Sequence, residues 1–261
     1  VSDALLKLKI PQAGFLPDIL PINYNNPSPK PIVAPVSTVL FVPKTPSSST
    51  TPATGETTAT PIPIIPQESN IPQTKHWTDL PTPGTIVLLQ QPSGQICAVC
   101  GDILATRLKV RGVKGIVADG RVRDIISLSD LCQAPSTAST SGEGRGGAGF
   151  TVWSRGTSTV GTGLAAQAWC VDVPLSVTNN PTPTSNTTAV AASSETPSPS
   201  LQVHPGDIIV CDEGERGSVV IPLSKLDEVL KLLPELKEAD EKCIADVESG
   251  VDVREAFRRH R

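Results

Sequence analysis

Residues 101–124, GDILATRLKVRGVKGIVADGRVRD, combine a clear structural pattern with most of the chain's candidate chemistry. An amphipathic run over 103–111 predicts a helix, and the apolar run 115–118 predicts a short strand. A helix that packs back on a strand returns the chain close to its start, so we expect Asp102, Arg123 and Asp124 to share one cleft. Two carboxylates beside a guanidinium suit a hard divalent cation and an anionic substrate.

The glycines of this stretch fit the same interpretation. Gly112 and Gly115 bracket the turn from helix to strand, and Gly120 is expected to let the chain bend before Arg123 and Asp124. Surface ion pairs are the alternative role for the charged side chains, and residue types alone leave that alternative open.

Outside this stretch, short apolar runs alternate with turn signals and a few helical patterns. A helical region covers 223–261, and Pro234 is expected to interrupt it. The layout predicts a single α/β domain over residues 1–261. Strands are expected at 36–42, 85–89, 96–99, 150–153, 169–177, 208–211 and 219–221, and short helices at 2–8 and 125–131.

Three tracts rich in Pro, Ser, Thr or Gly are predicted to be flexible insertions in this domain. They cover residues 43–75, 134–149 and 178–200. Their composition lacks the apolar residues whose burial would offset the conformational entropy lost on ordering. No internal repeat is evident, so the tracts interrupt one domain rather than join several.

Charge and hydropathy disfavour several classes of partner. The formal net charge of -4 gives no reason to expect nucleic acid or an anionic membrane. No apolar run approaches the ~20 residues of a membrane span. The basic residues Arg107, Lys109, Arg111 and Lys114 lack interleaved aromatic residues, so we interpret them as a solvated helix face.

Motifs of the common hydrolase, zinc and nucleotide sites do not occur. The sequence has no G-x-S-x-G, H-E-x-x-H or P-loop pattern. Only three histidines are present, so a histidine-based triad is not expected. Cys97 and Cys100 form a C-x-x-C in an apolar run without a second pair, and we predict buried structural thiols there.

The amino-terminal sequence reads as a helix already in progress at Val1. We therefore expect that residues before Val1 have been trimmed, together with any targeting segment. Because no secretory signal is recognisable and reduced thiols are expected, the predicted location is the cytoplasm.

At Asp102, Arg123 and Asp124 the chain resembles the RraA-like family, whose aldolase members carry the signature D-x20-R-D. Similar flanking blocks occur in the same order at residues 1–5, 115–120, 205–207 and 219–222, so the resemblance covers most of the chain outside its insertions. The insertions are unusual for the compact bacterial members, and the chain looks like a eukaryotic, fungal-like member.

The resemblance implies an α/β/β sandwich of the swivelling type, assembled as a homotrimer or a hexamer with active sites between subunits. It also implies Mg²⁺ or Mn²⁺ as cofactor. By carry-over, Asp124 would bind the metal directly and Asp102 would hold a metal-bound water. Asp3 and Glu241 match, by position only, further metal-binding acids contributed by a neighbouring subunit.

The same resemblance implies a 2-oxo acid as the small-molecule substrate. Arg123 would bind it, and the backbone at Gly101, Ile103 and Leu104 would contact its carboxylate or enolate. The implied activity is that of a class II pyruvate aldolase, a carbon–carbon lyase that cleaves 4-hydroxy-4-methyl-2-oxoglutarate or a related 4-hydroxy-2-oxo acid. Oxaloacetate decarboxylation would use the same pyruvate enolate, stabilised by the metal and the guanidinium.

Two alternatives remain open from the sequence. One is a non-catalytic regulator of the ribonuclease inhibitor type, which the retention of Asp102, Arg123 and Asp124 disfavours. The other is a family member recruited to a different 2-oxo-acid reaction, which the three insertions keep open.

Overall fold

The strands form one curled, mixed sheet, and a second sheet has only two strands. The structure, a computed structural model, describes residues 1–23, 27–44, 65–133, 149–178 and 200–261. The strands are β1 (Leu20–Pro21), β2 (Ile32–Pro43), β3 (Ile86–Gln90), β4 (Ala98–Cys100), β5 (Gly115–Val122), β6 (Thr151–Thr157), β7 (Ala166–Val171), β8 (Leu175–Val177), β9 (Leu201–Val203), β10 (Ile208–Asp212) and β11 (Gly217–Ile221). The α-helices are α1 (Ser2–Lys7), α2 (Asp102–Val110), α3 (Ile125–Gln133), α4 (Leu226–Glu248) and α5 (Val253–His260). Short 3-10 helices are η1 (Pro11–Gly14), η2 (Trp77–Asp79), η3 (Thr162–Leu164) and η4 (Leu223–Lys225).

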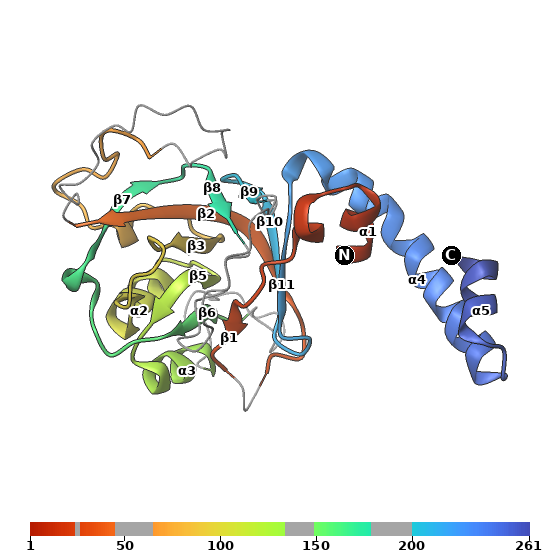
Figure 1. The fold of residues 1–261 in the computed structure, drawn as a ribbon. Helices are drawn as coiled ribbons and strands as arrows, with labels where there is room; N and C mark the ends of the chain where they lie inside the picture. Colours follow the sequence, from red (N-terminus) through yellow and green to blue (C-terminus); the bar gives the residue numbers. More distant parts are fainter. Residues whose placement is uncertain (24–26, 45–64, 134–148, 179–199) are drawn as a thin grey trace, which may run out of the picture.

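The long strand β2 organises the main sheet, whose order is β1-β6-β5-β3-β2-β10-β11. Its first residues pair antiparallel with β10, its middle pairs parallel with β3, and its last residues pair antiparallel with β7. Strands β3, β5 and β6 continue the parallel centre, and β4 adds to the end of β5. Because β2 changes partners along its length, the sheet curls until it is nearly closed (Figure 1).

Alternation along the central strands builds a core on each face of the sheet. Val87 and Leu89 of β3 face the layer of α2 and α3. Ile86 and Leu88 face the opposite way, into a core shared with Trp153 and with apolar residues of β8 to β11. One layer of helices and two layers of strands result, so the predicted α/β/β sandwich is confirmed.

The carboxyl-terminal helices α4 and α5 project from the sheet on the side opposite α2 (Figure 1). The start of α4 is anchored by a third apolar cluster, in which Val229 packs with Ala4 and Leu5 of α1 and with Ile221 of β11. Among the described helices, none is both long and apolar enough to cross a membrane.

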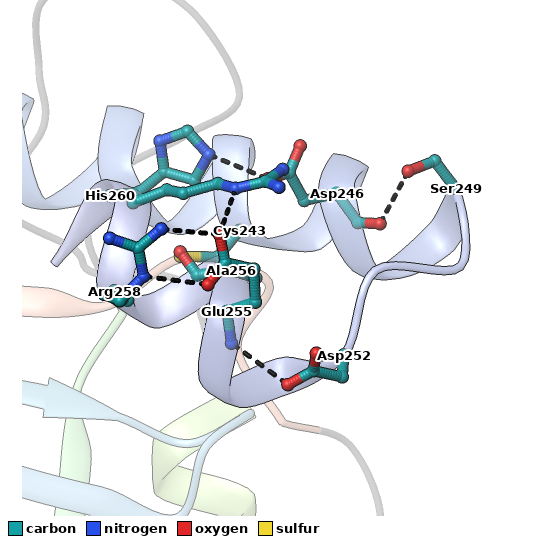
Figure 2. A network of polar contacts seen from close by, with 9 residues as sticks. Cys243, Asp246, Ser249, Asp252, Glu255, Ala256, Arg258 and His260 are labelled. Atoms are coloured by element: carbon teal, nitrogen blue, oxygen red, sulfur yellow. Dashed lines mark hydrogen bonds and ion pairs between the residues drawn. The ribbon is translucent and has the colours of Figure 1, made fainter.

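Helix α5 folds back on the end of α4 through a network of polar contacts (Figure 2). Asp246 of α4 lies 3.1 Å from His260 Nε2 and 3.2 Å from Arg259 Nη1. Glu255 accepts hydrogen bonds from Arg258 and Arg259 within α5, so it stabilises that short helix and orients the arginine that reaches Asp246.

Several element boundaries differ from the sequence-based expectation. Strand β2 starts at Ile32 rather than at residue 36, because the edge formed by β10 gives its first residues a pairing partner. The strand predicted over 169–177 is divided into β7 and β8 at Asp172, whose φ is +54° and whose Oδ1 accepts from Ser37 Oγ at 2.6 Å. Both differences arise from contacts between residues far apart in the sequence.

The expectation that Pro234 interrupts the last helical region was wrong. Helix α4 is continuous from Leu226 to Glu248 with Pro234 inside it. A proline in a helix interior costs about 3 kcal/mol. Leu232, Leu233 and Leu236 pack against the same apolar cluster on both sides of the proline, which favours a continuous helix.

Part of the predicted insertion 43–75 is packed against the sheet. Asn70 exchanges two hydrogen bonds with the backbone of Val171, at 2.7 and 2.8 Å, and Trp169 Nε1 donates to the Pro66 carbonyl at 2.7 Å. These contacts cover the edge of β7, a role that composition does not reveal. The rest of that insertion, 45–64, lies outside the described residues, as do 134–148 and 179–199 of the other two.

The buried character predicted for Cys97 and Cys100 is confirmed. Both thiols are free and at most 2% exposed, and they belong to the core between the sheet and α2.

Glu255 should make α5 sensitive to acid. Hydrogen bonds from Arg258 and Arg259 lower the pKa of Glu255 from 4.5 to about 2. A carboxyl group whose pKa is lower in the folded state stabilises that state above its unfolded pKa, and this contribution is lost as the pH falls through the folded pKa. We therefore expect amide hydrogen exchange in α5 to accelerate, relative to the intrinsic rate, as the pH falls from about 4.5 towards about 2.

The matched variants separate this effect from general acid unfolding. Glu255→Gln should show fast α5 exchange already at neutral pH, whereas Glu235→Gln, a change at an exposed position of α4, should exchange like the wild type. Unchanged α5 exchange in Glu255→Gln would contradict the assigned role.

Candidate functional site

The carboxyl ends of β4 and β5 bring the predicted site residues together. Strand β4 ends at Cys100, Gly101 occupies the N-cap position of α2, and Asp102 is the first helical residue. After β5, the N–H of Arg123 donates to the Cys100 carbonyl at 3.0 Å, which brings Arg123 and Asp124 beside the start of α2. The chain thus returns across a helix and a strand to its own starting point.

The carboxylate of Asp124 lies at the centre of this cluster. Its Oδ2 is 3.2 Å from Arg123 Nε and accepts the backbone N–H of Asp102 at 3.4 Å. The first turn of a helix offers unpaired N–H groups and a positive dipole end, so it favours a negative charge at this position. The side chains of Arg123 and Asp124 are 41% and 34% exposed, so both remain accessible to a ligand.

The backbone of Asp124 adopts an unusual conformation. Its φ is +61°, a region that residues other than glycine seldom occupy, and its carbonyl accepts the N–H of Leu128 in the first turn of α3. The start of α3 on one side and the contact with Gly101 on the other hold this residue in place. Strain of this kind is common at functional sites.

Gly101 is required by the close approach of the two segments. A Cβ atom at Gly101 would lie 2.5 Å from Asp124 Oδ2 and 3.0 Å from Arg123 Nε. Any side chain here would displace the two groups that the sequence singles out as metal and substrate ligands.

A pocket of about 350 Å³ opens beside this cluster. It is lined by Ala98 and Cys100 of β4, by residues 101–104 of α2, by Arg123, and by residues 161–163. The predicted substrate contacts Gly101, Ile103 and Leu104 therefore do line a pocket. The N–H of Ile103, however, donates to Asp102 Oδ1 at 2.7 Å.

The thiol of Cys100 contributes neither charge nor a nucleophile to this pocket. Burial raises the pKa of Cys100 to about 12, and the nearby Asp124 carboxylate also raises it. The thiol is therefore protonated at neutral pH, and a protonated thiol is a poor metal ligand as well as a poor nucleophile.

The donor set at the pocket fits a hard cation that keeps water or substrate oxygens as ligands. The Asp102 carboxylate lines the pocket and the Asp124 carboxylate lies beside it, and Mg²⁺ is commonly held by one or two carboxylates together with waters and substrate oxygens. Within the described residues, no group of three or more His, Cys, Asp or Glu side chains forms an all-protein metal site. The chemistry therefore agrees with Mg²⁺ or Mn²⁺ and disagrees with a structural zinc site.

Asp3 and Glu241 are not part of the pocket in this chain. Asp3 belongs to α1 and Glu241 to α4, on the far side of the sheet from α2 (Figure 1). Glu241 lies 3.7 Å from Lys237 Nζ in an exposed pair. Their predicted role requires a second copy of the chain, and it stays a prediction.

Gln91 is a positioning residue that sequence reasoning missed. Its carboxamide is buried, donates to the Cys97 carbonyl at 2.6 Å and accepts the N–H of Arg121 at 2.9 Å, so it joins the ends of β3, β4 and β5. Gly120 leaves room for it, since a Cβ there would lie 2.5 Å from Gln91 Oε1. Gly120 lies in β5 where the pairing with β6 shifts register between Ala118 and Arg121, and its close packing against Gln91 is a role that the sequence did not indicate.

The second wall of the pocket, residues 161–163, was also missed. Thr162 Oγ1 donates to the Ala98 carbonyl at 2.6 Å, and a Cβ at Gly161 would lie 3.1 Å from Arg123 Nη1. The only signal in the sequence is the run of small residues G-T-S-T-V-G-T-G at 156–163. Nothing in that run indicates which part of the sheet it meets.

A larger depression, of about 530 Å³, lies beside residues 35–37 of β2 and the residues that precede β3. Asp172 is its one charged lining residue, and its Oδ1 already accepts from Ser37 Oγ and the Thr38 N–H. Of these two pockets the smaller is the better candidate, because Arg123, Asp102 and a helix amino terminus line it and the Asp124 carboxylate lies beside it.

Comparisons with known proteins identify the family and the fold of the chain. The sequence model of the RraA-like family, described as Aldolase/RraA, matches residues 1–220. An uncharacterized protein from Pseudomonas syringae pv. tomato str. DC3000 is similar in structure, with a TM-score of 0.61 and 22% identity, over 98% of this chain and 89% of that chain. RraAS2 from Streptomyces coelicolor, described as an unusual member of the RNase ES inhibitor RraA protein family, has a TM-score of 0.58 and 20% identity, over 92% of this chain and 88% of that chain. At these identities the two structures show a shared fold.

Replacement of Gly101 tests whether the close approach of Gly101 and Asp124 is needed for metal binding. In Gly101→Ala the new methyl group must displace Asp124 Oδ2, the mobile end of a side chain, so the fold should persist while the site is disturbed. We expect Mn²⁺ binding, followed by electron paramagnetic resonance, to weaken about tenfold or more, in the range of other site-supporting changes. The thermal midpoint should change little.

Gly163→Ala is the matched control, because a Cβ at this pocket-lining glycine would meet nothing within 4 Å. Equal Mn²⁺ affinity in the two variants would show that the contact between Gly101 and Asp124 has no part in the site.

Proposed function

The chain belongs to the RraA-like family, which contains both aldolase or decarboxylase enzymes and ribonuclease inhibitors, and we propose that this member is a carbon–carbon lyase. Its substrates are 4-hydroxy-4-methyl-2-oxoglutarate or a related 4-hydroxy-2-oxo acid, and oxaloacetate. The observation that carries the proposal is the meeting of Asp102, Arg123 and Asp124 at one pocket beside the amino terminus of α2.

In this proposal each of the three signature residues has a different role. Arg123 pairs with the substrate's carboxylate and oxo group, because a guanidinium matches a planar anion with two parallel N–H groups. Asp124 would bind Mg²⁺ or Mn²⁺, and Asp102 would hold a water beside it. When bound, the cation supplies Lewis-acid polarisation of the oxo group.

Bond cleavage then needs few protein groups. In the aldol reaction the C3–C4 bond breaks, the C4 hydroxyl gives its proton to a water held by Asp102, and the electron pair passes to the pyruvate fragment. In oxaloacetate the equivalent bond breaks with loss of CO₂, and no base is needed. In both cases Arg123 stabilises the negative charge that develops on the pyruvate fragment, a type of contribution worth about 3 kcal/mol.

The neighbouring subunit completes the site in this proposal. The active form is a homotrimer or a dimer of trimers, and Asp3 and Glu241 of an adjacent copy add acidic groups near the cation. Their position on α1 and α4, away from the chain's own pocket, is what supports a contribution between subunits.

Pyruvate release provides the direct test. Wild-type protein should release pyruvate from oxaloacetate or from 4-hydroxy-4-methyl-2-oxoglutarate with Mg²⁺, measured by coupled oxidation of NADH, and activity should stop with a chelator. Arg123→Ala and Asp124→Ala should each lower kcat/KM by about 10³-fold or more, since each removes charge stabilisation that acts in the transition state.

Each of two control variants removes a charge of the same sign as Arg123 or Asp124, at a position that does not line the pocket. Arg107→Ala removes a guanidinium that pairs with Asp79, and Asp130→Ala removes an exposed carboxylate of α3. Both should keep wild-type activity. Activity that survives in folded Arg123→Ala or Asp124→Ala would overturn the site assignment.

The alternatives make different predictions for the same assay. A regulator of the ribonuclease inhibitor type, the class named for the Streptomyces relative, would release no pyruvate from either substrate. An enzyme recruited to another 2-oxo acid would remain inactive on these two substrates and would still lose its own activity in Asp124→Ala.

A further inference from the structure

Lys44 is a cation attached to the wall of the pocket by two hydrogen bonds. It directly follows β2, and its backbone N–H donates to the Ala165 carbonyl at 2.8 Å. Its Nζ donates to the carbonyl of Gly163, one of the pocket-lining residues, at 3.1 Å. This bond holds the exposed ammonium against one residue of the pocket wall, and Lys44 itself is not a lining residue.

The two cations of this region contact opposite ends of the same short wall. Arg123 Nη1 lies close to Gly161, where a Cβ would be 3.1 Å away, and Lys44 Nζ contacts Gly163. Gly161 and Gly163 are two residues apart, a separation of at most about 7 Å. A five-carbon diacid has its carboxylate carbons about 5 Å apart, judged from its C–C bonds, so it is long enough to extend along this wall from one contact towards the other.

The charge of Lys44 is available to a ligand. An ammonium group has three N–H donors, and the Gly163 carbonyl takes one of them. That partner is neutral, and no carboxylate of the described residues lies within ion-pair distance of Nζ. Arg121, the other cation near this end of the sheet, instead donates to the Thr157 carbonyl and does not line the pocket.

We propose that Lys44 determines specificity for dicarboxylic 2-oxo acids by binding the distal carboxylate while Arg123 holds the 2-oxo-acid end. This inference rests on the proposed function for the identity of the pocket. Lys44 lies outside the D-x20-R-D signature, and in this proposal it makes the pocket prefer dicarboxylic to monocarboxylic 2-oxo acids.

Calorimetric titration with two unreactive ligands tests the inference separately from catalysis. 2-Oxoglutarate and 2-oxopentanoate have the same five carbons and differ only in the distal carboxylate. In the presence of Mg²⁺, wild-type protein should prefer 2-oxoglutarate. Lys44→Ala should weaken 2-oxoglutarate about fivefold, the size expected for an exposed ion pair, and leave 2-oxopentanoate unchanged.

Three further variants sharpen the comparison. Lys44→Arg keeps the charge and should retain most of the preference for the diacid. Lys114→Ala removes a lysine just before β5, at the opposite end of that strand, and Arg121→Ala removes the neighbouring cation. Both should bind the two ligands as the wild type does.

Four results would contradict the proposal. Equal weakening of both ligands in Lys44→Ala would mean that Lys44 only supports the wall, and loss of the preference in Arg121→Ala would assign it to that residue. No preference in the wild type, or no binding of either ligand, would also overturn it. If 2-oxoglutarate binds through Lys44 but pyruvate is never released from the aldol substrate or from oxaloacetate, the proposed function fails and this inference stands.

Discussion

The contact between the Asp124 carboxylate and the first turn of α2 is the constraint on which the site depends. The carboxylate occupies the space that a side chain at Gly101 would fill, and it accepts the N–H of Asp102. A negative charge is favoured there by the helix amino terminus, and it holds the Arg123 guanidinium at 3.2 Å. One ion pair, one helix terminus and one glycine thus fix the three signature residues relative to one another.

The sheet makes this contact possible. Strand β5 lies between β3 and β6 in a parallel arrangement, so its carboxyl end comes out beside the end of β4 and the start of α2. Gln91 joins the ends of the same three strands, β3, β4 and β5, with its carboxamide, and Gly120 makes room for it. The candidate site therefore rests on the ends of strands and on helix termini, whose backbone hydrogen bonds fix the positions of its side chains.

Residues 65–75, the described end of the first insertion, and helices α4 and α5 pack against different parts of the sheet. The described end of the first insertion covers the edge of β7, the strand that follows the pocket wall at residues 161–163. Helices α4 and α5 carry Glu241 away from the chain's own pocket, and the ion pairs of Asp246 and Glu255 hold α5 in place.

The sequence by itself determined the class of fold and which three charged residues meet at the start of α2. The apolar runs indicated strands whose alternate residues are buried on opposite faces of the sheet. The spacing of Asp102 from Arg123 and Asp124 indicated that the chain returns to Asp102 after one helix and one strand. Only the tertiary structure decided that residues 161–163 form the second wall, that Lys44 reaches it, that Asp172 divides a predicted strand and that Pro234 lies inside a continuous helix. The reason is physical: periodicity and turn chemistry act between near neighbours, whereas these four features depend on packing between segments distant in the chain, which no local pattern records.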